Sequence, residues 1–208
     1  MKKKTKVKQG PAKVTKAKPK PKQNHHALMD MAAVLYRERE IRRRVKELSW
    51  DIERDYAGKD LVVVSLLNGT VMFLADLVRY LDMPLRLDFM GVSSYGKGTK
   101  SGKVVFTKEL KLDVKGRDVL LVDDILDTGK TLALVTSKLK KLKPRSLKVC
   151  VLLSKSARRT EKVVADYVGF EIPDAFVVGY GLDFAEQYRN LPFIGVLKPE
   201  IYELVAKK

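Results

Sequence analysis

The chain has 208 residues, of which 45% are hydrophobic and 32% are charged, so its length and composition fit one folded globular domain. Its formal net charge is +17, but the first 29 residues hold ten lysines and no acidic residue, which leaves 32 basic and 25 acidic residues for the rest. The excess charge therefore belongs mainly to a terminal segment, and this weakens a nucleic-acid-binding interpretation that rests on overall charge alone.

Residues 1–26 form a low-complexity segment that we predict to be disordered. The segment combines repelling lysines with three prolines, and it has few apolar residues to bury. His25 and His26 close it, and two adjacent histidines without further ligands are weak evidence for a metal site. The folded domain is therefore predicted to span residues 27–208.

Helical and strand patterns alternate along that domain. Amphipathic periodicity predicts helices at residues 38–56, 71–81 and 131–142. Short β-rich runs predict strands at residues 60–67, 85–90, 103–110, 118–126, 146–154, 167–172 and 176–181. Residues 91–103 are rich in Gly, Ser and Lys and predict a mobile loop. This order predicts an α/β fold with a mostly parallel twisted sheet flanked by helices.

The most informative segment spans residues 119–132 and reads VLLVDDILDTGKTL. A hydrophobic strand ends in Asp123 and Asp124, Asp127 follows on the loop, and a turn of small residues opens a helix. Ligands of open α/β sheets bind outside the carboxyl ends of the strands. The glycine turn offers free N–H groups to a phosphate, and the carboxylates can accept hydrogen bonds from sugar hydroxyls or hold Mg²⁺ through water. The unit is therefore predicted to hold a ribose 5-phosphate.

Three other interpretations of this segment compete with that prediction. A Walker A motif needs a glycine five residues before Gly129, where Asp124 stands. A dinucleotide-binding fingerprint lacks its glycines. The third interpretation is a solvated strand end with an N-capping Asp or Thr. This interpretation is disfavoured because two acids stand at the end of a buried strand, next to a turn suited to phosphate.

The same segment resembles the motif that binds phosphoribosyl pyrophosphate (PRPP) in type I phosphoribosyltransferases. From about Val34 to Pro199 the chain also resembles the hypoxanthine–guanine branch of that family. The matching segments include residues 65–79, 87–102, 168–184 and 188–200. The resemblance implies a small hood formed by about residues 27–40 and 167–208. It also implies a pentosyltransferase of purine salvage, which joins the phosphoribosyl group of PRPP to N9 of hypoxanthine or guanine and releases pyrophosphate.

On the PRPP side, the resemblance implies roles for individual residues. Asp127 matches the candidate general base near purine N7, and it also lies in the PRPP site. Asp123 and Asp124 match acids that address the ribose hydroxyls and Mg²⁺. The family often has Glu at the first position, so the shorter Asp123 implies a water-mediated contact. The matching 5-phosphate loop comprises Thr128, Gly129, Lys130 and Thr131.

On the purine side, Lys155 matches the lysine that donates to the 6-oxo group, which would disfavour adenine. Phe176 matches the aromatic residue that stacks on the purine, and Val177 offers backbone atoms to the other edge of the ring. Asp183 is implied at the purine pocket and as a ligand of Mg²⁺ on pyrophosphate. Arg189 matches a pyrophosphate contact.

Two loops complete the implied PRPP site. Ser94 and Tyr95 match a pair on a lid that excludes water from the reactive sugar. The pyrophosphate turn is Leu67, Asn68 and Gly69, where the family often has lysine in the middle and a cis peptide. Asn68 keeps hydrogen-bonding capacity and loses a positive charge, so the resemblance carries over backbone N–H contacts at this turn but no lysine-specific role.

The sequence also indicates where the protein is located, which cofactor it uses and how it assembles. A single cysteine, Cys150, excludes an intramolecular disulfide and favours the cytoplasm. No apolar segment of membrane-spanning length is present, and the basic start has no apolar region typical of a secretory signal. The resemblance implies Mg²⁺ as cofactor and a homodimer or homotetramer. Two other functions stay open, namely a PRPP-fold RNA-binding regulator with the lysine segment as its electrostatic arm, and a sister transferase that prefers xanthine.

Overall fold

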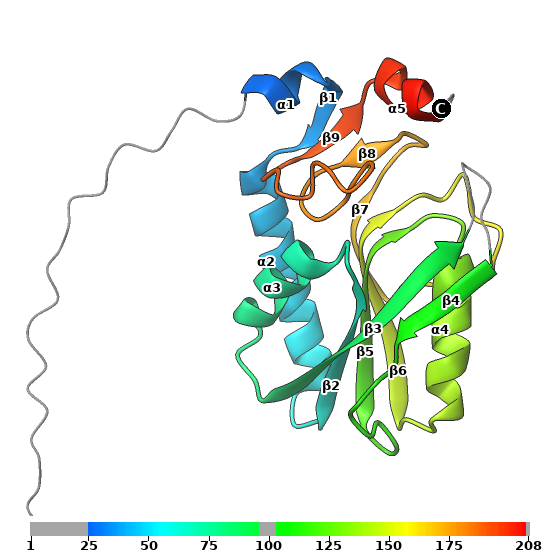
Figure 1. Ribbon diagram of the computed structural model, residues 1–208. Coiled ribbons are helices and arrows are strands. Elements are labelled where there is room, and N and C mark those ends of the chain that lie inside the picture. Colours follow the sequence, from blue (N-terminus) through cyan, green and yellow to red (C-terminus); the bar gives the residue numbers. More distant parts are fainter. Residues whose placement is uncertain (1–24, 96–102, 207–208) are drawn as a thin grey trace, which may run out of the picture.

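The computed structural model describes residues 25–95 and 103–206. A six-stranded sheet forms its centre, with strand order β4-β3-β2-β5-β6-β7 (Figure 1). All neighbouring strands run parallel except β3 and β4, which are antiparallel. The strands are β2 (Leu61–Leu67), β3 (Leu85–Tyr95), β4 (Lys103–Lys108), β5 (Asp118–Leu126), β6 (Ser146–Ser154) and β7 (Tyr167–Glu171). The predicted α/β class with a mostly parallel sheet is confirmed.

Helices cover both faces of this sheet (Figure 1). α2 (Glu38–Tyr56) and α3 (Val71–Tyr80) pack on one face, and α4 (Lys130–Lys141) packs on the other. Successive residues of a strand point to opposite faces, so Val63 joins the cluster under α2 and α3 while Val62 joins the cluster under α4. A strand that is covered on both faces has to be apolar over its covered length, which explains the largely hydrophobic centres of β2, β5 and β6.

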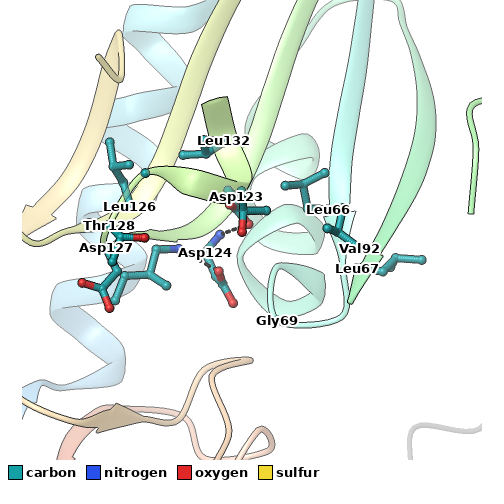
Figure 2. A pocket seen from close by; sticks show the side chains of 13 residues that line it. Leu66, Leu67, Gly69, Val92, Asp123, Asp124, Leu126, Asp127, Thr128 and Leu132 are labelled. Carbon is teal, nitrogen blue, oxygen red and sulfur yellow. Dashed lines mark hydrogen bonds between the residues drawn. The ribbon is translucent and has the colours of Figure 1, made fainter. Parts of the chain in front are cut away.

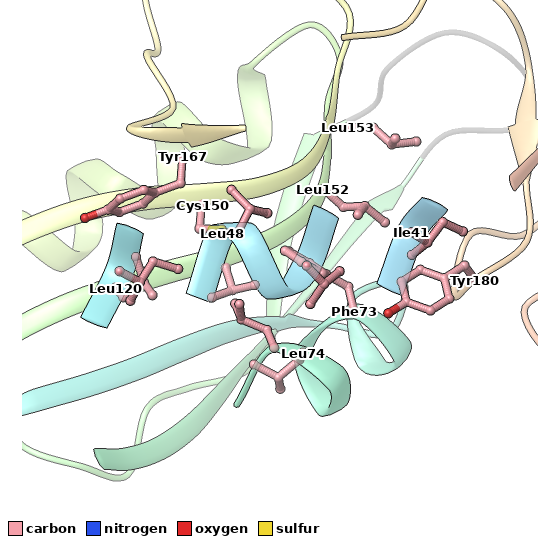
Figure 3. Packing of buried hydrophobic residues seen from close by; sticks show 14 of the residues in the cluster. Ile41, Leu48, Phe73, Leu74, Leu120, Cys150, Leu152, Leu153, Tyr167 and Tyr180 are labelled. Atoms are coloured by element: carbon pink, nitrogen blue, oxygen red, sulfur yellow. The ribbon is translucent and has the colours of Figure 1, made fainter. Parts of the chain in front are cut away.

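The cluster under α2 contains the side chains that predicted this helix. Ile41 and Leu48 point from α2 toward the sheet, where Leu152 and Cys150 of β6 meet them (Figure 3). Cys150 is fully buried, and burial raises the pKa of its thiol. Its interpretation as a small buried hydrophobic residue is confirmed, because a buried protonated thiol is neither a nucleophile nor a ready metal ligand.

A second, three-stranded antiparallel sheet forms the hood, with order β1-β9-β8. Its strands are β1 (Met31–Tyr36), β8 (Val177–Val178) and β9 (Ile194–Leu197), and the short helices α1 (His25–Met29) and α5 (Pro199–Ala206) lie beside it (Figure 1). A small core of its own includes Met31, Val178, Leu191 and Leu197. Segments that are far apart in sequence therefore share one hydrophobic cluster.

Several predicted boundaries are wrong. Residues 167–171 form β7 of the central sheet, because they pair with β6, so they do not belong to the hood. His25 and His26 begin α1 rather than ending the predicted disordered segment. Gly91–Tyr95 were predicted as loop but continue β3, since β4 pairs with them. Residues 1–24 and 96–102, including most of the predicted tail and loop, lie outside the described residues. No described helix combines the length and the hydropathy needed to cross a membrane.

Candidate active site at the carboxyl end of β5

A cavity of about 260 Å³ opens where β2 and β5 end and α4 begins (Figure 2). The lining comes from the end of β2 and the turn after it, from the end of β5 with the loop that leads into α4, and from Val92 of β3. The cavity therefore forms at the carboxyl ends of neighbouring parallel strands, where the sequence predicted ligand binding. The residues that line it are Leu66, Leu67, Gly69, Val92, Asp123, Asp124, Ile125, Leu126, Asp127, Thr128, Gly129, Thr131 and Leu132.

Two adjacent carboxylates lie at this site, of which Asp123 is buried and Asp124 is partly buried. Asp123 is only 8% exposed and accepts a hydrogen bond from the backbone N–H of Asp124 at 3.0 Å. Asp124 accepts one from the N–H of Ile125 at 2.7 Å. Burial raises the pKa of Asp123, and the neighbouring Asp124 charge raises it further; burial also raises the pKa of Asp124. The pair consequently presents closely spaced carboxylate oxygens whose charge is poorly solvated.

This donor set fits a hard divalent cation. Mg²⁺ binds through one or two carboxylates and otherwise keeps water and substrate phosphates as ligands. Within residues 25–95 and 103–206, no three Asp, Glu, His or Cys side chains come close enough to form a metal site made only of protein groups. Asp183 therefore does not join Asp123 and Asp124 in one cluster, although the sequence named all three as metal ligands.

Replacing Asp124 by Asn should stabilise the fold. The neutral amide relieves the repulsion between two adjacent, poorly solvated charges, so the free energy of unfolding should rise by about 1 kcal/mol at pH 7 to 8. A carboxyl whose pKa is raised in the folded state destabilises that state when it is ionised and not when it is protonated. The difference in free energy of unfolding between the variant and the wild type should therefore shrink toward pH 4. Urea unfolding at both pH values measures this. Replacing the exposed Asp82 by Asn is the control, and an equal gain there would contradict the explanation.

The turn that opens α4 has the geometry expected of a phosphate site. Gly129 precedes the helix with φ +87°, a left-handed conformation that glycine adopts without strain. The first turn of a helix leaves backbone N–H groups without helical partners, and here it borders the cavity through Thr131. Thr128 fixes the turn, because its carbonyl accepts hydrogen bonds from the N–H groups of Thr160 and Glu161 at 3.0 and 3.1 Å. Lys130 is exposed and does not line the cavity.

Asp127 projects from the loop between β5 and α4. Its Oδ1 atom is buried and has no hydrogen-bond partner among the described residues. Its Oδ2 atom lies 3.6 Å from Nη1 of Arg158, which is also 3.7 Å from Oδ1 of Asp174. An orphaned buried acceptor at a cavity is a place where a ligand N–H can bind. Arg158 was not predicted, and the only sequence signal for it is a basic doublet three residues after Lys155.

The turn at residues 67–69 packs tightly against β5 and the hood. The peptide bond between Leu67 and Asn68 is cis, as expected. A Cβ atom at Gly69 would lie 1.6 Å from Oδ2 of Asp124, and a Cβ at Gly181 would lie 2.0 Å from the carbonyl oxygen of Gly69. The Gly69 backbone therefore lies in direct contact with both β5 and the hood. Asn68 is exposed and does not line the cavity, so the structure brings the backbone of this turn to the site but not the Asn68 side chain.

None of the four residues predicted for the purine, Lys155, Phe176, Val177 and Asp183, lines this cavity. Lys155 follows β6 and is 5% exposed, and its backbone N–H donates to the carbonyl of Leu126 at 2.9 Å. Phe176 is 40% exposed, whereas the backbone of Val177 is part of β8. Arg158 lies between Asp127 and Asp174 and faces both carboxylates, and Asp174 stands two residues before Phe176 in the chain.

Arg189 is held within its own loop. Its guanidinium donates to the carbonyl of Gly181 at 2.8 Å and pairs with Asp183 at 2.8 Å and with Glu186 at 3.1 Å. Its charge also lowers the pKa of Asp124, against the effect of burial. Glu186 was not predicted as a partner. The backbones of Ser94 and Tyr95 pair with β4, while their side chains lie outside the described part of the chain.

Comparison with known proteins agrees with this geometry. The family model for the phosphoribosyl transferase domain matches residues 32–185. The chain is 47% identical over 175 residues to the hypoxanthine-guanine phosphoribosyltransferase of Bacillus subtilis, covering 84% of this chain and 97% of that protein. It is 48% identical to the bifunctional protein TilS/HprT of Listeria monocytogenes over 83% of this chain, but it spans only 27% of that relative. A crystal structure of a hypoxanthine phosphoribosyltransferase from Staphylococcus aureus matches with a TM-score of 0.83 and 47% identity, over 87% of this chain and 99% of that chain. The chain therefore belongs to the phosphoribosyltransferase family.

Proposed function

We propose that this chain is a hypoxanthine–guanine phosphoribosyltransferase of purine salvage. It transfers the 5-phosphoribosyl group of PRPP to N9 of hypoxanthine or guanine, and the products are IMP or GMP and pyrophosphate. The observation that carries the proposal is the cavity at the end of β5, which combines one buried and one partly buried carboxylate, an orphaned Asp127 oxygen and the N-terminus of α4. The chain spans nearly the whole length of the B. subtilis relative, which supports the same activity.

PRPP occupies the cavity in this proposal. The turn at residues 128–131 holds the 5-phosphate, because helix N-terminal N–H groups and threonine hydroxyls are donors that suit a phosphate. Asp123 and Asp124 address the ribose hydroxyls, and the backbone of residues 67–69 with Arg189 meets the pyrophosphate. Arg189 would exchange its contact with Glu186 for the pyrophosphate, which is the more highly charged anion. Ser94 and Tyr95 close over the sugar as part of a lid.

The purine lies between Asp127 and the hood. Its N7 hydrogen would meet the Oδ1 atom of Asp127, which accepts that proton or stabilises the positive charge that develops as N9 attacks C1 of the ribose. Lys155 donates to the 6-oxo oxygen. Phe176 stacks on the ring, and the backbone of Val177 addresses its far edge. Asp183 supports this pocket through its ion pair with Arg189.

Mg²⁺ is the proposed cofactor. When bound, it supplies neutralising charge to the leaving pyrophosphate. Asp123 and Asp124 would hold it, directly or through water, on the ribose side, and Asp183 would contribute on the pyrophosphate side. Asp123 and Asp124 suit this role because their pKa values are raised by burial, so a nearby cation would offset an unfavourable charge.

The remaining proposals concern the state of the protein in the cell. We place it in the cytoplasm as a homodimer or homotetramer, with PRPP and a 6-oxopurine as its small-molecule partners. The ten lysines of the first 29 residues would give weak, salt-sensitive contact with nucleic acids through counterion release.

Replacing Lys155 by Ala should weaken purine binding. Loss of a charged hydrogen bond to the 6-oxo group is worth about 1–3 kcal/mol, so the KM values for hypoxanthine and guanine should rise and discrimination against adenine should fall. Steady-state kinetics with each base measures this, with the exposed Lys162 replaced by Ala as the matched control. Unchanged KM values for both oxopurines in the Lys155 variant would remove Lys155 from the purine site.

The proposed function is tested by assaying the wild-type protein with PRPP and Mg²⁺ against hypoxanthine, guanine, xanthine, adenine and uracil. Nucleotide and pyrophosphate should form in equal amounts with hypoxanthine, guanine or both. A marked preference for xanthine would replace the substrate assignment by the sister activity. Absence of product with every base would overturn the proposal.

A further inference from the structure

The ring proposed to stack on the purine is itself stacked on a second aromatic ring. Phe176 and Tyr202 have centroids 5.2 Å apart and an interplanar angle of 26°, and Phe184 meets Phe176 edge-on at 5.6 Å and 89°. Both contacts have favourable aromatic geometry. Phe176 is therefore held by one parallel ring and one perpendicular ring, which together restrict its tilt and its translation.

The two supporting rings lie on the hood side of Phe176. Phe184 and Tyr202 pack against the hood core around Met31, Val178 and Leu197, whereas Phe176 remains 40% exposed. The backbone carbonyl of Phe176 is fixed as well, since it accepts a hydrogen bond from the N–H of Leu197 at 2.9 Å. One face of the Phe176 ring is therefore covered from the hood, and the uncovered surface is left for a ligand.

We infer that Tyr202 of α5 is a positioning residue for purine binding, which acts by holding the ring of Phe176 in the orientation that a flat bicyclic base requires. The inference rests on the proposed function and extends it to a residue remote from the PRPP cavity. A ring that is fixed before binding does not lose rotational freedom when the base arrives, so more of the stacking energy appears as affinity. Tyr202 would thus affect the purine and leave PRPP binding unchanged.

The α5 helix supplies its own matched control. Ile201 precedes Tyr202 and also packs against the hood core, but it provides no aromatic ring. Replacing Ile201 by Ala weakens the docking of α5 without removing the stacked partner. Replacing Tyr202 by Phe keeps the ring and removes only the hydroxyl, and replacing it by Leu keeps apolar volume and removes the ring.

The test compares the Tyr202→Ala, Tyr202→Leu, Tyr202→Phe and Ile201→Ala variants in the full-length chain. Steady-state kinetics gives the KM for hypoxanthine and guanine at saturating PRPP, and the KM for PRPP at saturating base. Tyr202→Ala and Tyr202→Leu should raise the purine KM by roughly 3- to 10-fold with the PRPP KM unchanged. Tyr202→Phe should restore the wild-type value, and Ile201→Ala should leave the purine KM within about twofold of it.

Three results would overturn the inference. An unchanged or lowered purine KM in Tyr202→Leu would show that the ring is not needed or that it competes with the base. An equal rise in Ile201→Ala would assign the effect to α5 docking in general, and failure of Tyr202→Phe to rescue would assign it to the hydroxyl. Wild-type activity separates these outcomes from failure of the proposed function: if the wild type makes no nucleotide, both the function and the inference fall, whereas an active wild type with a neutral Tyr202→Leu variant removes the inference alone.

Discussion

Replacing Asp127 by Asn should lower kcat by roughly 10²-fold or more, while PRPP affinity changes little. The buried Oδ1 atom of Asp127 has no partner among the described residues, so a purine N–H would be its natural donor. Asparagine keeps the shape of the side chain but can neither accept the proton nor carry the negative charge that stabilises the developing cation. Single-turnover and steady-state rates with hypoxanthine measure the loss.

The matched control for this change is Asp174→Asn. Asp174 and Asp127 both face Nη1 of Arg158, at 3.7 and 3.6 Å, so the control also removes one carboxylate from that arginine. It should change kcat by no more than a few-fold, because Asp174 has no assigned contact with the base. Near-wild-type turnover in Asp127→Asn would exclude Asp127 as proton acceptor, and an equally large loss in Asp174→Asn would shift the role to the arrangement around Arg158.

Replacing Gly69 by Ala should reduce kcat/KM for PRPP by roughly 10²-fold, because a displacement of about 1 Å in a reacting group can have that effect. The new Cβ would fall 1.6 Å from Oδ2 and 2.8 Å from Cγ of Asp124. The carboxylate would have to move, and with it the group proposed to hold the ribose and Mg²⁺. Titration with PRPP and Mg²⁺ together with steady-state kinetics measures the result.

Gly116→Ala is the control for the general effect of adding a methyl group to a glycine. Gly116 has φ +68° and no atom within 4 Å of an added Cβ, so alanine there introduces backbone strain without a clash. It should cost about 1 kcal/mol of stability and leave kcat/KM unchanged. If Gly69→Ala retains full activity, Asp124 either tolerates displacement or has no role in PRPP binding.

The sequence predicted the central sheet well because its signals are local. Ile41 and Leu48 recur on one face of α2, and the apolar runs of β5 and β6 are continuous because helices cover both faces of the sheet. The cavity followed from the same reasoning, since acids at a strand end beside a glycine turn are adjacent in the chain.

Two of the hood strands, β1 and β9, and several site contacts could not be predicted in this way. β1 pairs with β9, and their paired residues, such as Met31 and Leu197, are separated by most of the chain. The sequence around either strand therefore does not indicate its partner. The contacts of Arg158 with Asp174 likewise depend on how loops after different strands meet. The pairing of Arg189 with Glu186 is local, but sequence alone did not indicate which anion the arginine contacts in this structure.

The order of the hood strands determines which part of the protein can fold first. β9 lies between β1 and β8, yet it follows both of them in the chain, so neither strand has its hood neighbour until residues 194–197 have been made. The parallel core through β6 and the cavity at the end of β5 need none of those residues. During synthesis the part of the site proposed to bind the sugar phosphate can therefore assemble first, and the hood, which carries Phe176 and Val177 of the proposed base pocket, assembles last by long-range pairing that is slower than local contacts. On the proposed function, a ribosome-bound chain should acquire affinity for phosphoribosyl compounds before the hood part of its base pocket has formed.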